Sequence, residues 1–505
     1  MSDLTSRPSS TDRCVRRSAP SILVVQISFL FAFAAQGLLA DDIREIPLGN
    51  SSAHELIDQF GQPLTALAGG GFGVIWVSGL PESYLHIQWL DPAGEILFES
   101  GGRVIAGPGV RFASMAAHPS GGAFVAFGEP ADQGFQLLVQ FFDATGAPQW
   151  PGTGVPVSNL AEDQSPPALV ADLDGGVFAC FSAAGVRCQR LNAAGEQQWS
   201  PAANLAGASE EFTSEPQGVL DDEGRLMIFW INLRNAFDET LEFVRIEGQR
   251  FDDDGQIVWD SDGLLVHQTS LAETDRFGPT MFEVASDCTG GAVVAFNDWI
   301  DQSEPNFDVA AQRVSPVGEL LWGDGAAVVA SPSHFQHETT ISAPGGGAFV
   351  VTTEDVNESE SRLWLYRLDG SGQHLFTPPL ELSDPSSPGL HYSTHGSFDE
   401  GLLRLAWTKE VVPFSLEMNV ELATLTLDGE RREETVTSAV GAQFCHGLAY
   451  SPDTGETLVL WEDYRSGDWD DPDVYSAMVS GDGSIFQNGF ESGSLDAWSA
   501  TVGDR

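Results

Sequence analysis

The hydrophobic and polar positions of the chain follow a pattern that repeats along most of its length. Each copy opens with a Gly-rich turn and continues into a short apolar run that ends in an aromatic or small residue, as in Gly70–Trp76 and Gly121–Phe127. The turns lie at residues 70, 121, 175, 224, 290, 346, 401 and 455, at intervals of 49 to 66 residues. An apolar strand repeated at this period predicts a propeller or a solenoid.

A second element of each copy is a tight Asp-x-x-Gly turn between two strands. Six segments fit this pattern and end in Trp or Phe: Asp91–Phe98, Asp143–Trp150, Asn192–Trp199, Asp252–Trp259, Ser315–Trp322 and Asp369–Phe376. The copies near Asp428 and Asp482 lack the aromatic residue. The Asp or Asn side chain can accept from its own backbone, and Gly supplies the positive φ that the turn needs, so each segment predicts a hairpin.

A fourth strand fits between successive units, for example at Ala113–Ala117, which makes four strands per repeat. The segment Ile43–Asn50 resembles Gly154–Asn159, so we expect the N-terminus to supply a strand to the last repeat. Such a closure removes open sheet edges. The sequence therefore predicts an all-β fold, an eight-bladed β-propeller of four-stranded blades closed by an N-terminal strand, over residues 41–486.

These motifs also resemble known families. The Asp-x-x-Gly turns followed by Trp resemble a relaxed Asp-box of sialidase-like propellers, and Trp461–Gly467 resembles repeats of exported bacterial propellers. The resemblance covers residues 43–486 and implies the fold. In that family the Asp-box is a folding element on the face away from the active site. Sialidases also carry an Arg-Ile-Pro strand, which this sequence lacks.

The two ends of the chain differ from the repeats. Arg13, Arg16 and Arg17 precede an apolar run from Ile22 to Ala40, which predicts a signal peptide over residues 1–40, with cleavage after Ala34 or Ala40. An uncleaved anchor is the alternative. Residues 487–505 resemble a Gly-Phe-Glu-Ser-Gly…Trp tail of exported bacterial proteins, which is compatible with a recognition tag, a remnant of a β-sandwich or a frayed terminus.

The charge of the chain restricts its partners. Asp and Glu number 73 against 23 Lys and Arg, the formal net charge is −50, and Lys409 is the only lysine. Such a surface repels phosphate backbones and anionic membranes and concentrates cations, although solubility alone also explains it. We expect a secreted or cell-surface monomer with no nucleic-acid partner and no membrane span in the mature chain.

The long loops on one face of the predicted propeller combine aromatic and acidic residues, which suits a sugar or a cationic peptide. The candidate ligand-binding residues are Trp299, Asp463, Tyr464, Arg465 and Trp469. Ordinary solvation of surface loops explains the same composition.

Histidines provide the sharpest candidate for chemistry. Counted back from the Gly-rich turns, His337 and His446 occupy equivalent positions near the start of the innermost strand, and His391 lies one residue away in the repeat between them. Glu338 and His395 stand beside them. At a channel mouth these five residues could hold a divalent metal or act as acid and base, whereas the structural alternative is three inner-strand histidines.

Cys180 and Cys188 flank a predicted hairpin turn symmetrically, so we expect them to face each other and form a disulfide after export. Taken together, the sequence predicts a secreted propeller that recognises a carbohydrate or peptide on its long-loop face. The alternative is a metal-assisted carbohydrate-active hydrolase or lyase with a His-lined channel mouth. Neither the ligand nor any catalysis follows from the sequence.

Overall fold

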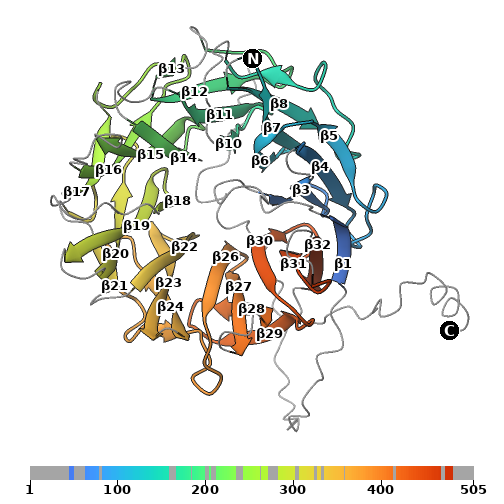
Figure 1. The fold of residues 1–505 in the computed structure, drawn as a ribbon. Helices are drawn as coiled ribbons and strands as arrows, with labels where there is room; N and C mark the ends of the chain where they lie inside the picture. The colour runs from blue at the N-terminus through green and yellow to red at the C-terminus, as the bar shows by residue number, and fades with distance from the viewer. Residues whose placement is uncertain are drawn as a thin grey trace, which may run out of the picture.

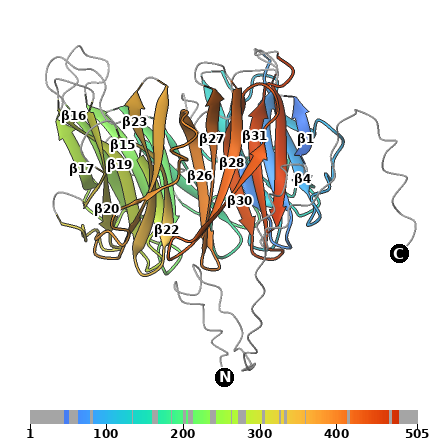
Figure 2. The same ribbon diagram turned by 90° about the horizontal axis from the view of Figure 1, so that it is seen from below.

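The computed structural model confirms the all-β propeller. It describes residues 45–50, 63–78, 82–132, 134–158, 167–183, 185–199, 204–205, 212–234, 243–261, 263–270, 282–301, 306–323, 327–330, 335–357, 359–412, 417–467 and 472–480. These residues form eight four-stranded antiparallel sheets arranged as blades in a ring (Figure 1). Figure 2 shows the ring from the side, with the strands running roughly from one face to the other. No helix long and apolar enough to cross a membrane occurs in this described part of the chain.

The first four blades follow the order of the sequence from the innermost to the outermost strand. They are β2 (Leu64–Ala66), β3 (Phe72–Ser78), β4 (Tyr84–Leu90) and β5 (Arg103–Ala106); β6 (Arg111–Ala117), β7 (Ala123–Pro130), β8 (Phe135–Phe142) and β9 (Val155–Pro156); β10 (Ala168–Ala171), β11 (Val177–Ser182), β12 (Val186–Leu191) and β13 (Asn204–Leu205); β14 (Phe212–Leu220), β15 (Leu226–Arg234), β16 (Phe243–Arg250) and β17 (Leu264–Ser270).

The remaining blades repeat this order, except that the last one takes its outer strand from the N-terminus. They are β18 (Phe282–Ser286), β19 (Ala292–Asp301), β20 (Asn306–Val314) and β21 (Ala327–Ala330); β22 (Phe335–Ala343), β23 (Gly347–Asn357), β24 (Glu360–Leu368) and β25 (Leu380–Glu381); β26 (His391–Asp399), β27 (Leu402–Val412), β28 (Glu417–Thr426) and β29 (Arg431–Thr437); β30 (Gln443–Ser451), β31 (Glu456–Asp463), β32 (Asp473–Ser480) and β1 (Glu45–Asn50).

The predicted closure is therefore present in the structure. Strand β1 pairs with β32, from Glu45 opposite Ala477 to Asn50 opposite Asp473. Glu45 also accepts a hydrogen bond from Thr437 at 2.6 Å and forms an ion pair with Arg465 at 2.7 Å. The first described strand thus joins the last two blades, and the ring closes without an open sheet edge at this seam.

The core lies between the blades. The second strand of each blade is buried on both faces, because its alternate side chains pack against the preceding and the following blade, and eight apolar clusters fill the eight interfaces. The fifth position of this apolar run is aromatic in seven blades, at Trp76, Phe127, Phe181, Trp230, Phe296, Trp407 and Trp461. Blade 6 carries Thr352 there instead.

The Asp-x-x-Gly turns connect neighbouring blades as well as strands. Asp143 accepts hydrogen bonds from the amides of Thr145 and Ala147, at 2.9 and 3.0 Å, and holds its turn. The aromatic that ends this segment, Trp150, donates from its indole to the carbonyl of Ala193 in the turn of the next blade, at 3.1 Å. Gly195 in that turn has a φ of +78°, and a Cβ there would lie 2.9 Å from the Trp150 ring. Trp199, Trp259 and Trp322 repeat the indole contact.

A buried glutamine accompanies these aromatics in the first five blades. Gln140 accepts from the backbone of Trp150 at 2.9 Å, and its amide donates to the Trp150 carbonyl at 3.2 Å. The glutamines in the same position are Gln88, Gln189, Gln249 and Gln312. Each satisfies the backbone where the outer hairpin leaves the regular sheet, so the polar residue inside the core has a structural reason.

Candidate functional site

The innermost strands of all eight blades surround a central cavity of about 340 Å³. Among the described residues, every ionisable one that lines it comes from blades 5 to 8. The strands that carry them are β18, β22, β26 and β30, whose positions in the ring Figure 1 shows. Blades 1 to 4 contribute uncharged residues, mainly Pro, Leu, Ala and Gly with Ser114 and Gln217. The cavity therefore has one polar and one largely apolar wall.

Strand β22 places two of the predicted residues at this cavity. Its pairing with β23 is interrupted between His337 and Thr339, so Glu338 occupies a β-bulge. The imidazole of His337 lies with Nε2 2.7 Å from the Thr340 hydroxyl. Burial lowers the pKa of His337 to about 4, so the ring is neutral at pH 7.

Two carboxyl groups share the cavity with this histidine. Glu283 on β18 accepts from the backbone amide of Thr340, and its carboxylate lies 4.0 Å from His337 Nε2. Glu338 accepts from the Thr353 hydroxyl at 2.8 Å and from the Thr394 amide at 3.4 Å. Burial raises the pKa of both carboxyl groups to about 7. Each can therefore give or take a proton near neutral pH.

The polar wall continues into blades 7 and 8 with His395 and His446. Burial, and secondarily the charge of His446, lowers the pKa of His395 to about 4. His446 lies with Nε2 3.3 Å from a carboxylate oxygen of Glu462, which also accepts from the Tyr464 hydroxyl at 3.1 Å. Thr394, directly before His395 on β26, also lines the cavity, and its buried hydroxyl has no hydrogen-bond partner. This hydroxyl has unused hydrogen-bonding capacity.

His391 does not lie in the central cavity. It precedes the bulge of β26, pairs with Lys409 on β27 and lines a separate cavity between blades 6 and 7. The bulges also determine which residues occupy equivalent positions in blades 6, 7 and 8. Glu338 and His446 both occupy the bulge of their strand, and Thr394 lies in the bulge of β26. Four of the five predicted residues thus line one cavity, and His391 lines another.

The predicted loop residues have defined partners where they are described. The buried carboxylate of Asp463 accepts from Trp461 Nε1 at 2.9 Å and from the Arg465 guanidinium at 2.6 and 2.8 Å. Tyr464 is buried. These contacts belong to the closing blade, and a ligand role for the three residues stays a prediction. The backbone of Trp299 lies in β19, but its side chain and all of Trp469 fall outside the described residues, as do residues 1–40 and 487–505.

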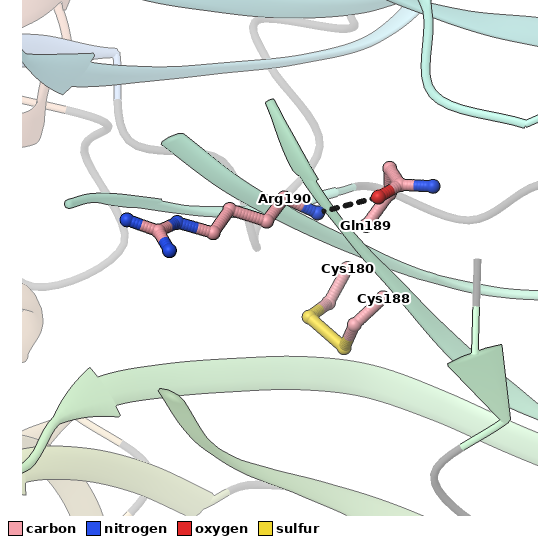
Figure 3. The surroundings of a disulfide bond; sticks show 4 residues. All are labelled: Cys180, Cys188, Gln189 and Arg190. Carbon is pink, nitrogen blue, oxygen red and sulfur yellow. Dashed lines mark hydrogen bonds between the residues drawn. A yellow bond between two sulfur atoms is a disulfide. The ribbon is translucent and has the colours of Figure 1, made fainter. Parts of the chain in front are cut away.

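Cys180 and Cys188 form a disulfide between β11 and β12 (Figure 3). They are directly opposite in the strand register, with their Cα atoms 4.1 Å apart. Figure 3 also shows the amide of Arg190 donating to the side chain of Gln189, at 2.9 Å. The disulfide links the two strands of one hairpin in the third blade.

In the part of the chain that the structure describes, no group of three or more His, Cys, Asp or Glu residues could hold a metal ion. His337 and Glu338 instead bond to threonines. The histidines and carboxyl groups can serve in hydrogen bonding and proton transfer.

Glu283 and Thr394 are the cavity residues that sequence reasoning missed. The signal for Glu283 is a single acid within the short apolar strand β18, Phe282–Ser286. Thr394 carries no comparable signal, because a threonine in a strand is ordinary. Only the ring arrangement brings these two residues beside Glu338.

Comparisons with known proteins bear on the fold alone. No family model and no curated protein sequence matches the chain. Among solved structures, a polysaccharide lyase of family PL25, an ulvan lyase, aligns over 75% of this chain and 96% of its own, with 9% identity and a TM-score of 0.47. An α-L-arabinanase from Penicillium chrysogenum aligns over 64% of this chain and 94% of its own, with 10% identity and a TM-score of 0.39. A puromycin-hydrolyzing peptidase of Mycobacterium tuberculosis aligns over 82% and 61%, with 12% identity and a TM-score of 0.42. Similarities this low carry no inference about function.

Proposed function

We propose that the protein is an exported binding propeller that holds a carbohydrate unit in its central cavity. The observation that carries this proposal is the division of the cavity into a polar wall from blades 5 to 8 and a largely apolar wall from blades 1 to 4. A sugar ring has hydroxyl edges and C–H faces, so it can satisfy both walls at once. Among the residues that the structure describes, no Lys or Arg lines the cavity, which favours a neutral or amino sugar over an acidic one.

The Cys180–Cys188 disulfide supports export, because such bridges persist in oxidising compartments. The Arg-rich start of the chain and its apolar run from Ile22 to Ala40 point in the same direction. We therefore assign a secreted or cell-surface location.

The test is binding of uncharged oligosaccharides to the purified protein, by glycan array and then calorimetry. Thr394→Val removes the hydroxyl that lacks a partner and is expected to weaken binding about tenfold, the upper range for one neutral hydrogen bond. The matched control is Thr352→Val, at a fully buried threonine on β23 of blade 6 that does not line the cavity. Absence of binding to any neutral glycan, or equal binding by Thr394→Val, would reject the proposal.

A cationic peptide is the second ligand class, and the carboxyl groups of Glu283 and Glu338 favour it. Because burial raises both pKa values to about 7, a cation should bind more tightly as the pH rises from 6 to 8 and the two groups ionise. Oligolysine titrations over this range distinguish the classes, since a neutral sugar gains no ionic attraction from the same ionisation.

Catalysis is the alternative function, and the same two carboxyl groups are the observation that favours it. A carboxyl group at the cavity wall with a pKa near 7 suits general acid–base chemistry on a glycosidic bond. Turnover of a bound oligosaccharide that disappears in Glu338→Gln, with its binding retained, would replace the binding assignment with a carbohydrate-active enzyme.

A further inference from the structure

A second cavity, of about 260 Å³, lies between blades 6 and 7. Residues of β26, β27, β28 and β29 line it, together with Leu382, Ser383, Asp384 and Ser387, which follow β25. None of its lining residues lines the central cavity. It is smaller than the usual pocket for a drug-sized molecule, roughly 300–1,000 Å³, so its size suits a small metabolite.

The indole of Trp407 gives this cavity a hydrogen-bond donor. Trp407 is 3% exposed, and its Nε1 has no hydrogen-bond partner. Trp461 occupies the same position in blade 8, where its Nε1 donates to Asp463 two residues further on, at 2.9 Å. Lys409 stands at that position in blade 7, and an ammonium cannot accept the indole proton.

His391 gives the cavity an acceptor. The ring is 4% exposed, and Nδ1 lies 3.1 Å from the carbonyl oxygen of Ser361, to which it donates. Nε2 then carries the lone pair, and it is buried without a partner. Burial, and secondarily the charge of Lys409, lowers the pKa of His391 to about 4, so the acceptor persists at neutral pH.

Lys409 and Glu421 add opposite charges to this pair. The ammonium of Lys409 donates to Ser387 Oγ at 3.1 Å, and among the described residues it forms no ion pair, so other N–H groups remain for a ligand. The Glu421 carboxyl group accepts from the Thr435 hydroxyl at 2.9 Å. Its pKa is raised to about 7, chiefly by burial, so an arriving cation would favour the ionised form.

We propose that the cavity between blades 6 and 7 binds a small zwitterion, of which a free α-amino acid is the simplest example. Lys409 Nζ and Trp407 Nε1 donate to the ligand carboxylate, and His391 Nε2 and Glu421 accept from its ammonium group. A ligand with only a carboxylate would be repelled by Glu421, Glu433 and Glu434 and would carry no positive charge to offset this repulsion. A ligand with only an ammonium group would be repelled by Lys409. This site is independent of the carbohydrate proposed for the central cavity.

The experiment is a calorimetric titration of the full chain at pH 7 with single L-amino acids, beside propionate, propylamine and glucose. We expect at least one amino acid to bind and each single-charge analogue and glucose to bind at least about tenfold more weakly. Absence of binding by every amino acid at about 10 mM would overturn the proposal. Tighter binding of glucose or propionate would overturn the zwitterion assignment.

Variants locate the ligand. Lys409→Met is expected to weaken amino-acid binding at least about tenfold, and Trp407→Phe about threefold to tenfold. The matched control is Trp230→Phe, because Trp230 has the same strand position and an indole without a partner, but lines neither cavity. Equal loss in Trp230→Phe and Trp407→Phe would overturn the location.

A second readout covers the case in which Lys409→Met fails to fold. In ¹⁵N spectra of the unmodified chain, the indole N–H signal that is missing from Trp407→Phe should move downfield with added amino acid, while the signal assigned from Trp230→Phe stays in place. An unmoved Trp407 signal at saturation would overturn the site even if an amino acid binds elsewhere.

Discussion

Blades 7 and 8 share a sheet topology and a tryptophan at the same position of the second strand, yet they use it differently. In blade 8, Asp463 follows Trp461 by two residues and accepts the indole proton as well as the Arg465 guanidinium. In blade 7, Lys409 follows Trp407, and the indole has no partner. The residue two positions after the tryptophan is thus an acceptor in blade 8 and a cation in blade 7, and only the blade 8 indole has a partner.

This difference in indole contacts corresponds to the position of each blade relative to the ring closure. Blade 8 contains the closure, and Arg465 extends the contacts of Asp463 to Glu45 on β1 at 2.7 Å. Blade 7 supplies all four of its own strands, and the hydrogen bond from Thr437 to Glu45 links it to the seam. The comparison teaches that equivalent positions of a repeat can serve stability in one copy and leave hydrogen-bonding capacity in another.

The largest expected effect is the loss of the Asp463 carboxylate. Asp463→Ala removes the acceptor of the Trp461 indole and one of the two carboxylates that pair with the Arg465 guanidinium, the other being Glu45. It is expected to lower the free energy of unfolding by about 3 kcal/mol. Lys409→Met should change it by about 0.5 kcal/mol or less, because Lys409 forms one hydrogen bond. Urea unfolding measures both, and similar losses would remove the distinction between the blades.

The next effect is a pH dependence from Glu421 in blade 7. Burial raises its pKa to about 7 from an ordinary value of 4.5, so the folded state binds more protons than the unfolded state between these pH values. Its contribution to stability is therefore present below pH 4.5 and lost as the pH rises through 7.

Glu421→Gln removes this loss. Between pH 4.5 and 8, the variant should gain about 1–2 kcal/mol relative to the unmodified chain, less than the full shift implies because the side chain is partly exposed. Glu417→Gln, at the exposed start of the same strand, is the control. Parallel stability profiles for Glu421→Gln and the unmodified chain would contradict this account.

The smallest effect compares the two tryptophans directly. Both substitutions by Phe remove the same ring volume, but only Trp461→Phe breaks a hydrogen bond to a buried carboxylate. Trp461→Phe should therefore destabilise the protein by about 1 kcal/mol more than Trp407→Phe. Thermal unfolding of the two variants measures the difference, and a difference of zero would show that the Asp463 contact contributes nothing.

Much of the fold could be predicted from particular residues. The Gly-rich turns and the apolar runs behind them mark the second strand of each blade, and the Asp-x-x-Gly turns mark the outer hairpins, because local backbone geometry demands these residue types. The similarity of Ile43–Asn50 to a blade strand correctly predicts the closure by β1. The buried Gln residues at 88, 140, 189, 249 and 312 repeat just as regularly and are a signal that was available.

The candidate site was predictable only in part. His337, Glu338, His395 and His446 line one cavity because they lie on innermost strands of adjacent blades. His391 lies only four residues before His395 but lines a different cavity, because the β26 bulge falls between them. Counting from a turn cannot locate a bulge, and an unrecognised bulge shifts every position beyond it to the other face of the strand.

The sequence by itself determined the repeat, the strand types, the turns and the facing cysteines, because each depends on residues close together in the chain. Only the tertiary structure decided which polar groups meet. Glu283 reaches His337 from the neighbouring blade, and His391 and His395 line different cavities. Those outcomes depend on the closure of the ring and the side chains packed between the blades, which no local pattern encodes.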